Sequence, residues 1–143
     1  MVEKASWRVR RPLTVGVRAI VLNDQNEFLL VRHTYIDGWY FPGGGVDKGE
    51  SLERAVAREL VEEVGVHLNS APTLVGAYTY LREYKSDHVI LYATKDWSIE
   101  PCRNLEIAES GFFSTDELPT DTSPGTLRRI AEYFGDTPQS DMW

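Results

Sequence analysis

The segment from Gly44 to Val66 constrains the fold of this chain more than any other part of it. It runs Gly44, five residues, Glu50, seven residues, Arg58-Glu59-Leu60, one residue, Glu62-Glu63, one residue, Gly65-Val66. Ser51 is a preferred helix N-cap residue, and Gly65 stands where many helices end in the left-handed conformation. The sequence therefore predicts a helix from Ser51 to about Val64, preceded by a glycine-rich loop.

Three glutamates share one face of this predicted helix. At 100° per residue, Glu59, Glu62 and Glu63 fall within an arc of about 100°, beside an apolar stripe. Like charges at this spacing repel one another, and Arg58 alone cannot neutralise three glutamates together with Glu50. Mg²⁺ can, because it binds carboxylate oxygens and leaves its other positions to water and phosphate. A solvated, glutamate-rich helix face is the competing interpretation, and the complete spacing favours the metal site.

Three glycines follow Pro42 at the entry to this segment. The run Gly43-Gly44-Gly45 lets the backbone turn sharply and lets a ligand approach the main chain closely. A main-chain carbonyl in the run is a further candidate oxygen ligand for a cation.

The rest of the chain alternates short strands with helices. Strands are predicted over residues 13–22, 27–33, 39–41, 74–81, 88–94 and 111–113, and a closing helix over 126–134. The turn at 23–26 predicts that the first two strands form a hairpin. This order favours an α/β fold in which helices flank a mixed sheet. The 143 residues fit one domain with its core at about 13–134, and residues 135–143 are expected to form a loose tail.

Charge and composition limit the partners. The net charge is −7, and the only small basic group, Arg8, Arg10 and Arg11, is expected to be a solvated strand entry, so a nucleic-acid partner is disfavoured. No stretch reaches the roughly 18 apolar residues of a membrane span, and the N-terminus lacks the apolar core of a signal peptide. Cys102 is the only cysteine and is expected to be an inert thiol in a reducing cytoplasm. A homodimer is compatible with these features.

The spacing of residues 44–66 is that of the Nudix box, and the chain resembles a Nudix hydrolase. The approach Trp-Tyr-Phe-Pro-Gly-Gly at 39–44 resembles the family's usual entry to the box. The Glu-Ser-Gly-Phe-Phe stretch at 109–113 also resembles the family. The resemblance runs from about residue 13 to 134. It implies an α/β/α sandwich whose catalytic motif is a loop-helix-loop. It also implies Mg²⁺-dependent cleavage of a nucleoside diphosphate linked to a group X, with Mn²⁺ as a substitute.

The resemblance also implies roles for the residues of the box. The implied metal ligands are Glu59, Glu62, Glu63 and the Gly43 carbonyl. Glu50 and Arg58 are implied to orient these ligands through hydrogen bonds and a salt bridge.

Outside the box, some members of the family recruit a general base from another loop. Glu106 and Glu109 are the candidates, and both also fit an ordinary surface carboxylate. Glu109 is favoured because it immediately precedes the predicted strand 111–113, whose end is expected near the metal helix. If the loop turns helically, however, both carboxylates share a face, so the sequence leaves the choice open.

Four residues are candidates for contacts with the substrate. Arg32 and His33 end the second predicted strand, and Gly44 allows close approach of a ligand. Tyr84 lies eighteen residues beyond Val66, where diadenosine polyphosphate hydrolases carry a tyrosine. Ordinary strand packing explains tyrosines in this region equally well.

Three functions are compatible with the sequence. The favoured one is hydrolysis of a free small nucleotide, such as a nucleoside triphosphate or a dinucleoside polyphosphate. The second is removal of pyrophosphate from an RNA 5′ end, which the acidic net charge disfavours. The third is a non-catalytic Nudix-like nucleotide sensor, which the intact box disfavours.

Overall fold

The computed structural model describes residues 13–82 and 85–143, with side chains described for 13–81 and 87–143. A four-stranded sheet has the order β4-β1-β7-β6. These strands are β1 (Leu13–Val21), β4 (Gly43–Gly45), β6 (Thr73–Arg82) and β7 (Lys85–Thr94). The sheet is mixed, because β1 and β7 run parallel whereas the β1–β4 and β6–β7 pairs are antiparallel.

A second sheet has three strands in the order β3-β2-β9. They are β2 (Phe28–His33), β3 (Trp39–Tyr40) and β9 (Ile107–Phe113). A small antiparallel pair, β5 (Val66–Leu68) with β8 (Trp97–Ile99), follows the box helix and was not predicted from the sequence. Its register brings the segment after β8 alongside the end of that helix.

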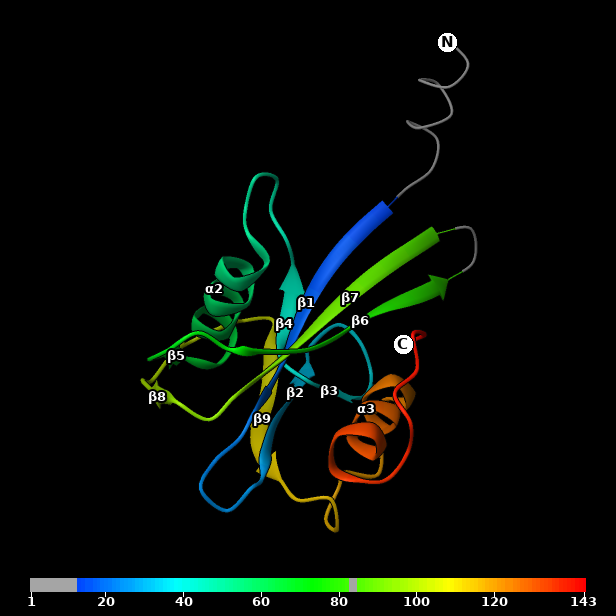
Figure 1. The fold of residues 1–143 in the computed structure, drawn as a ribbon. Coiled ribbons are helices and arrows are strands. Elements are labelled where there is room, and N and C mark those ends of the chain that lie inside the picture. Colours follow the sequence, from blue (N-terminus) through cyan, green and yellow to red (C-terminus); the bar gives the residue numbers. More distant parts are fainter. Residues whose placement is uncertain (1–12, 83–84) are drawn as a thin grey trace, which may run out of the picture.

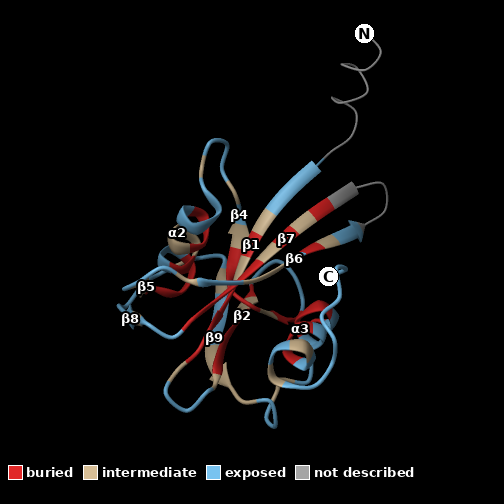
Figure 2. Cartoon of the chain, in the orientation of Figure 1, coloured by how far each residue is buried: buried red, intermediate tan, exposed pale blue. Residues whose placement is uncertain are grey.

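The two helices lie on opposite sides of the sheets (Figure 1). They are α2 (Leu52–Val64) and α3 (Pro124–Phe134). The buried apolar residues of α2 belong to one core cluster, whereas Ile130 of α3 belongs to another that lies beyond the central strands. The burial pattern in Figure 2 follows this arrangement, with the inward faces of both helices and the middles of the strands buried. The predicted α/β fold with a mixed sheet is confirmed. Among the described residues, no helix is long and apolar enough to cross a membrane.

The predicted hairpin between the first two strands is wrong. β1 and β2 belong to different sheets, and the link between them is an isolated bridge from Leu22 to Phe28. The reason lies in the side chains of β2, of which nearly all are buried. Leu29 and Val31 face one core cluster while Phe28 and Leu30 face the other. A strand covered on both faces belongs in the middle of the fold, where β2 pairs with β3 and β9.

Two other predicted boundaries shift. β9 begins at Ile107, four residues before the expected strand, so Glu109 lies within the strand and not in front of it. The closing helix α3 begins at Pro124, because the Ser123 side chain caps it by accepting a hydrogen bond from the Thr126 N–H.

The end of the chain differs from the expected loose tail. Thr79 of β6 donates its N–H to the Asp141 carbonyl at 2.8 Å and accepts the Trp143 N–H at 2.9 Å. The Trp143 ring packs edge-on against Tyr78 at 5.5 Å between ring centroids. A Cβ added to Gly125 would come within 2.3 Å of that ring, so the indole lies directly on α3. These contacts cover the free edge of β6, an edge that is open to pairing with other chains when exposed.

Trp143→Ala is therefore expected to destabilise the protein. Removing the ring takes away apolar contacts with Tyr78 and α3 and a cation–π contact with Arg129, whose guanidinium carbon lies 5.0 Å from the ring centroid. We expect a loss of about 2 kcal/mol of unfolding free energy and a fall in Tm of about 5 °C. Thermal unfolding measures this, with Met142→Ala as the control because Met142 is more exposed than Trp143. Equal melting temperatures for wild type and Trp143→Ala would contradict the interpretation.

Candidate active site

The helix α2 carries the box glutamates and is anchored by its apolar stripe. Ser51 caps its first turn by accepting a hydrogen bond from the Arg54 N–H at 3.2 Å, and Gly65 ends it with φ of 69°. Both caps are as the sequence predicted. The stripe consists of Ala55, Val56, Leu60 and Val64, which pack against Val17, Ala19 and Val21 of β1. This packing fixes the rotation of the helix, so the face bearing the glutamates lies alongside β4.

Arg58 joins the carboxylates of the helix to the loop before it. Its guanidinium binds both oxygens of Glu50, at 2.8 and 2.9 Å. It also donates to Glu59 at 3.0 Å, to Glu62 at 3.3 Å and to the Gly45 carbonyl at 3.0 Å. A bidentate arginine–carboxylate pair is rigid, so this arginine fixes the loop and two of the glutamates relative to each other.

The two carboxylates nearest to Arg58 have opposite electrostatic environments. The hydrogen bonds from Arg58, and then that from the Asp47 N–H, lower the pKa of Glu50 to about 2. Burial raises the pKa of Glu59 above its ordinary value, and the negative charge of Glu63 raises it further against the opposing hydrogen bond from Arg58. Negative charge is therefore crowded around Glu59, which is the condition that a bound cation relieves.

Glu63 is the most enclosed of the three glutamates, with 9% of its side chain exposed. Its Oε1 accepts the Gly43 N–H at 2.7 Å, and its Oε2 lies 3.6 Å from His33 Nε2. Among the described residues, His33 Nδ1 is buried without a hydrogen-bond partner. The structure thus brings His33, predicted as a substrate contact, directly against a predicted metal ligand.

The glycines of β4 are needed for these close approaches. Gly43 has φ of 154°, and an added Cβ there would lie 1.9 Å from the Val17 carbonyl oxygen. An added Cβ at Gly44 would lie 2.6 Å from the Glu59 carboxylate. The contact that Gly43 makes to the cluster in this structure is its N–H bond to Glu63. The carboxylate of Glu59 can rest on the main chain only because position 44 lacks a side chain.

The donor set fits a hard divalent cation in its chemistry, because all three helix side chains offer carboxylate oxygens. In the described part of the chain, no three Asp, Glu, His or Cys side chains converge closely enough to hold a metal ion. Arg58 draws Glu59 and Glu62 to its own side, while Gly43 holds Glu63. A shared site therefore requires at least one of these side chains to turn away from its present partner.

The two candidate general bases have different surroundings. Glu109 lies in β9 opposite Arg32 of β2, and the two side chains form an ion pair at 2.7 Å. Glu106 lies just before β9, and its N–H is held by the Asn104 side chain at 2.8 Å. Burial raises the pKa of Tyr35, and the charges of Glu106, Glu63 and Glu59 all raise it further. The Glu106 carbonyl accepts the Thr34 N–H at 2.9 Å, so Glu106 lies next to the end of β2 that carries His33.

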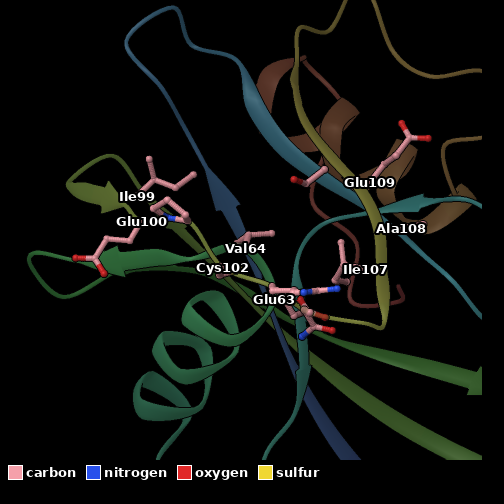
Figure 3. Close-up of a pocket in the computed structure, with 12 residues that line it drawn as sticks. Glu63, Val64, Ile99, Glu100, Cys102, Ile107, Ala108 and Glu109 are labelled. Atoms are coloured by element: carbon pink, nitrogen blue, oxygen red, sulfur yellow. The ribbon is translucent and has the colours of Figure 1, made fainter.

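Two cavities flank Glu63 and His33. One of about 590 Å³ has Glu63 and Val64 on one wall and residues 99–104 and 107–110 on the others. In Figure 3 the Glu109 side chain extends away from Glu63 in this pocket. The second cavity, of about 460 Å³, is lined by residues 32–38 with Tyr40 and Asp121. Arg32 and His33 line the second cavity, so the structure places both predicted substrate contacts beside the box.

Tyr78, a strand tyrosine in the region of the predicted contact Tyr84, packs away from this site. Tyr84 lies outside the residues whose side chains are described. Tyr78 is buried against α3 and Trp143, and it belongs to the core cluster on that side of the fold. Sequence reasoning missed the aromatic residues that do line the second cavity, Tyr35 and Tyr40. Their rings lie 5.3 and 5.7 Å from His33.

Sequence reasoning also missed Arg18. This residue of β1 lies opposite Gly43 in the strand register and donates from Nη1 to the Phe41 carbonyl at 2.8 Å. In the sequence it occupies an ordinary position of the strand predicted over residues 13–22. Arg18 is the only charged residue in β1, and this was the signal that could have identified it.

Comparison with known proteins agrees with this geometry. A model of the NUDIX domain matches residues 12–134. The chain belongs to the Nudix family. A Nudix hydrolase structure from Burkholderia pseudomallei, described as MutT, aligns with a TM-score of 0.76 at 25% identity, over 86% of this chain and 99% of that one. The predicted family and the prediction of a pyrophosphohydrolase are confirmed.

Two relatives differ in the substrate that their names state. A putative 8-oxo-dGTP diphosphatase from Bacillus subtilis is 30% identical over 120 residues, which are 84% of this chain and 79% of that protein. An RNA pyrophosphohydrolase from Yersinia enterocolitica is 34% identical over 80 residues, which are 56% of this chain and 46% of that protein. The names of these two relatives therefore state different substrates.

Proposed function

We propose that this Nudix hydrolase is a Mg²⁺-dependent pyrophosphohydrolase that acts on a free small nucleotide. The observation that carries the proposal is the arrangement of Glu59, Glu62 and Glu63 on one helix face, directly beside Gly43 and Gly44 and next to a cavity. Mn²⁺ is expected to replace Mg²⁺, because both accept oxygen ligands in similar geometry.

The proposal assigns a separate role to each group of residues in the box. Glu59, Glu62 and Glu63 would hold the cation, together with a main-chain oxygen at Gly43. Bound Mg²⁺ neutralises charge on the phosphate oxygens and on the leaving phosphate. Arg58, braced by Glu50, keeps the loop and the helix in register. A carboxylate accepts a proton from the attacking water, the new bond from oxygen to phosphorus forms, and the anhydride bond to the leaving phosphate breaks.

Two observations favour a free nucleotide over an RNA end. The putative 8-oxo-dGTP diphosphatase matches over most of both chains. The RNA pyrophosphohydrolase matches over less than half of its own length. The net charge of −7 also disfavours a long polyanion, which needs several basic contacts. Hydrolysis of an RNA 5′ end is the second candidate. It is included in the test because the chain shares sequence identity with the Yersinia RNA pyrophosphohydrolase.

A panel of substrates tests this proposal. Purified protein with Mg²⁺ is incubated with nucleoside triphosphates, 8-oxo-dGTP, dinucleoside polyphosphates and a triphosphorylated oligoribonucleotide, and phosphate and pyrophosphate are measured. We expect hydrolysis of a free nucleotide with a kcat/KM at least about tenfold above that of the oligoribonucleotide, and none in EDTA. Preference for the oligoribonucleotide would transfer the proposal to RNA ends. Turnover that persists in EDTA would overturn the metal mechanism.

The surroundings of the candidate bases lead to a prediction about Glu106. The Glu109 carboxylate is held by Arg32, whereas the Glu106 carbonyl accepts the N–H of Thr34, the residue after the His33 that lies against Glu63. We therefore expect Glu106→Gln to lower kcat by about a hundredfold and Glu109→Gln by less than about tenfold, since general bases typically contribute in the former range. Steady-state kinetics at saturating Mg²⁺ measure both variants. The reverse order would give the role to Glu109, as the sequence alone favoured.

A further inference from the structure

Arg129 is buried and Arg18 is half-buried, and of these two arginines only Arg129 has a carboxylate within salt-bridge distance. Arg129 of α3 is 1% exposed. Its Nη2 donates to Glu132 at 3.0 Å, its Nε lies 3.0 Å from the other oxygen of Glu132, and Nη1 donates to the Met142 carbonyl. Its charge is thus balanced within the protein, as is usual for an enclosed cation. The position of Arg129 is explained by structure alone.

Arg18 has no such balance. The structure records one hydrogen bond from its guanidinium, to the Phe41 carbonyl, and no carboxylate within salt-bridge distance of it among the described side chains. A guanidinium has five N–H donors in a planar fork, so most of them have no protein acceptor there. Burial lowers the pKa of Arg18, although the negative charge of Glu63 raises it in part. Arg18 is thus a half-buried cation without a direct anionic partner among the described side chains.

The position of Arg18 connects it to the active site. It pairs in the strand register with Gly43, whose N–H holds Glu63. Its guanidinium carbon lies 5.7 Å from the ring centroid of Tyr40, which also lines the 460 Å³ cavity. Arg18 remains partly exposed to solvent, so a ligand can reach it. Arg18 therefore lies near the box carboxylate Glu63 and near Tyr40, a residue of the adjoining cavity.

We propose that Arg18 binds a phosphate oxygen of the substrate, and that this phosphate supplies the anionic partner that the protein itself does not. The proposal rests on the proposed function and adds to it a substrate-binding residue on β1. A phosphate fits because its oxygens match the planar fork of arginine, and charge-assisted hydrogen bonds are about twice as strong as neutral ones. The alternative, in which Arg18 only supports the Phe41 carbonyl, requires one donor and no positive charge.

Binding of imidodiphosphate tests the proposal, because this non-hydrolysable diphosphate is the part common to all candidate substrates. Calorimetry in Mg²⁺ compares wild type with Arg18→Met, which keeps the length of the side chain without its charge, and Arg18→Lys, which keeps the charge without the fork. Arg54→Met is the matched control, since Arg54 lies exposed on α2. The measurement does not depend on turnover. The role of Arg18 can therefore be disproved while hydrolysis by wild type is observed. It can also be supported when the activity panel lacks the true substrate and shows no hydrolysis.

We expect Arg18→Met to weaken imidodiphosphate binding at least about tenfold, or about 1.4 kcal/mol, and Arg18→Lys to weaken it less. Arg54→Met should stay within about twofold of wild type, because an exposed charge remote from the ligand is screened. In turnover, Arg18→Met should raise KM more than it lowers kcat. Unchanged affinity in Arg18→Met, or no binding by wild type, overturns the proposal. If Arg18→Met fails to fold, Arg18→Lys decides: wild-type affinity in that folded variant with an unchanged KM also overturns it.

Discussion

Glu63→Gln is expected to lower kcat at least about a hundredfold while the protein remains folded, because the neutral amide cannot offset the charge of a divalent cation. Glu63 is the most enclosed of the three helix glutamates and the one held by a main-chain N–H. The amide has nearly the same shape and can still accept that hydrogen bond through its oxygen. The change therefore removes charge with little loss of packing, and the measurement is kcat at saturating Mg²⁺.

A control on the same helix makes this result specific. Glu53 lies exposed in the first turn of α2, so Glu53→Gln removes an equal charge away from the site. We expect its kcat to stay within about twofold of wild type. Mg²⁺ should raise the Tm of wild type and of Glu53→Gln, because a ligand that binds the native state stabilises it. A near-normal kcat for Glu63→Gln would mean that this carboxylate does not serve the reaction.

The box helix could be predicted closely because its determinants are local. Ser51 and Gly65 specify the two ends by cap geometry, and the order of apolar and acidic residues between them specifies the faces. The relation of Arg58 to Glu50 could be expected from the resemblance, but its further bonds to the Gly45 carbonyl depend on how the loop closes. Local sequence specifies the caps and faces of a helix, whereas the closure of a loop depends on tertiary contacts.

The errors arise where distant segments decide the outcome. The turn at 23–26 has the chemistry of a hairpin, yet β2 is buried on both faces and pairs elsewhere. The end of the chain is polar in sequence, yet Trp143 packs against α3 and β6. No local sequence pattern predicts this contact. Arg18 looks like a surface residue until the register of β1 with Gly43 is known. Each of these depends on pairing between parts of the chain that are far apart in sequence.

The adjacent glycines of β4 allow a sharper test of the metal site than the removal of a ligand. An added Cβ at Gly44 would lie 2.6 Å from the Glu59 carboxylate, whereas at Gly45 it would meet nothing within 4 Å. Neither residue has the positive φ that would strain an alanine. The two alanine variants thus differ in one respect, which is whether a methyl group occupies the place of the Glu59 carboxylate.

Gly44→Ala is expected to push that carboxylate aside and to lower kcat by about thirtyfold or more at fixed Mg²⁺, since metal sites depend on ligand positions within about 0.5 Å. The Tm without metal should change little, because the clashing atoms are the end of a flexible side chain. The rise in Tm caused by Mg²⁺ should shrink with the loss of activity. Gly45→Ala should resemble wild type in both measurements. If Gly44→Ala kept the activity and the Mg²⁺ response of wild type, then the metal site would not need Glu59 in its present place on the Gly44 main chain.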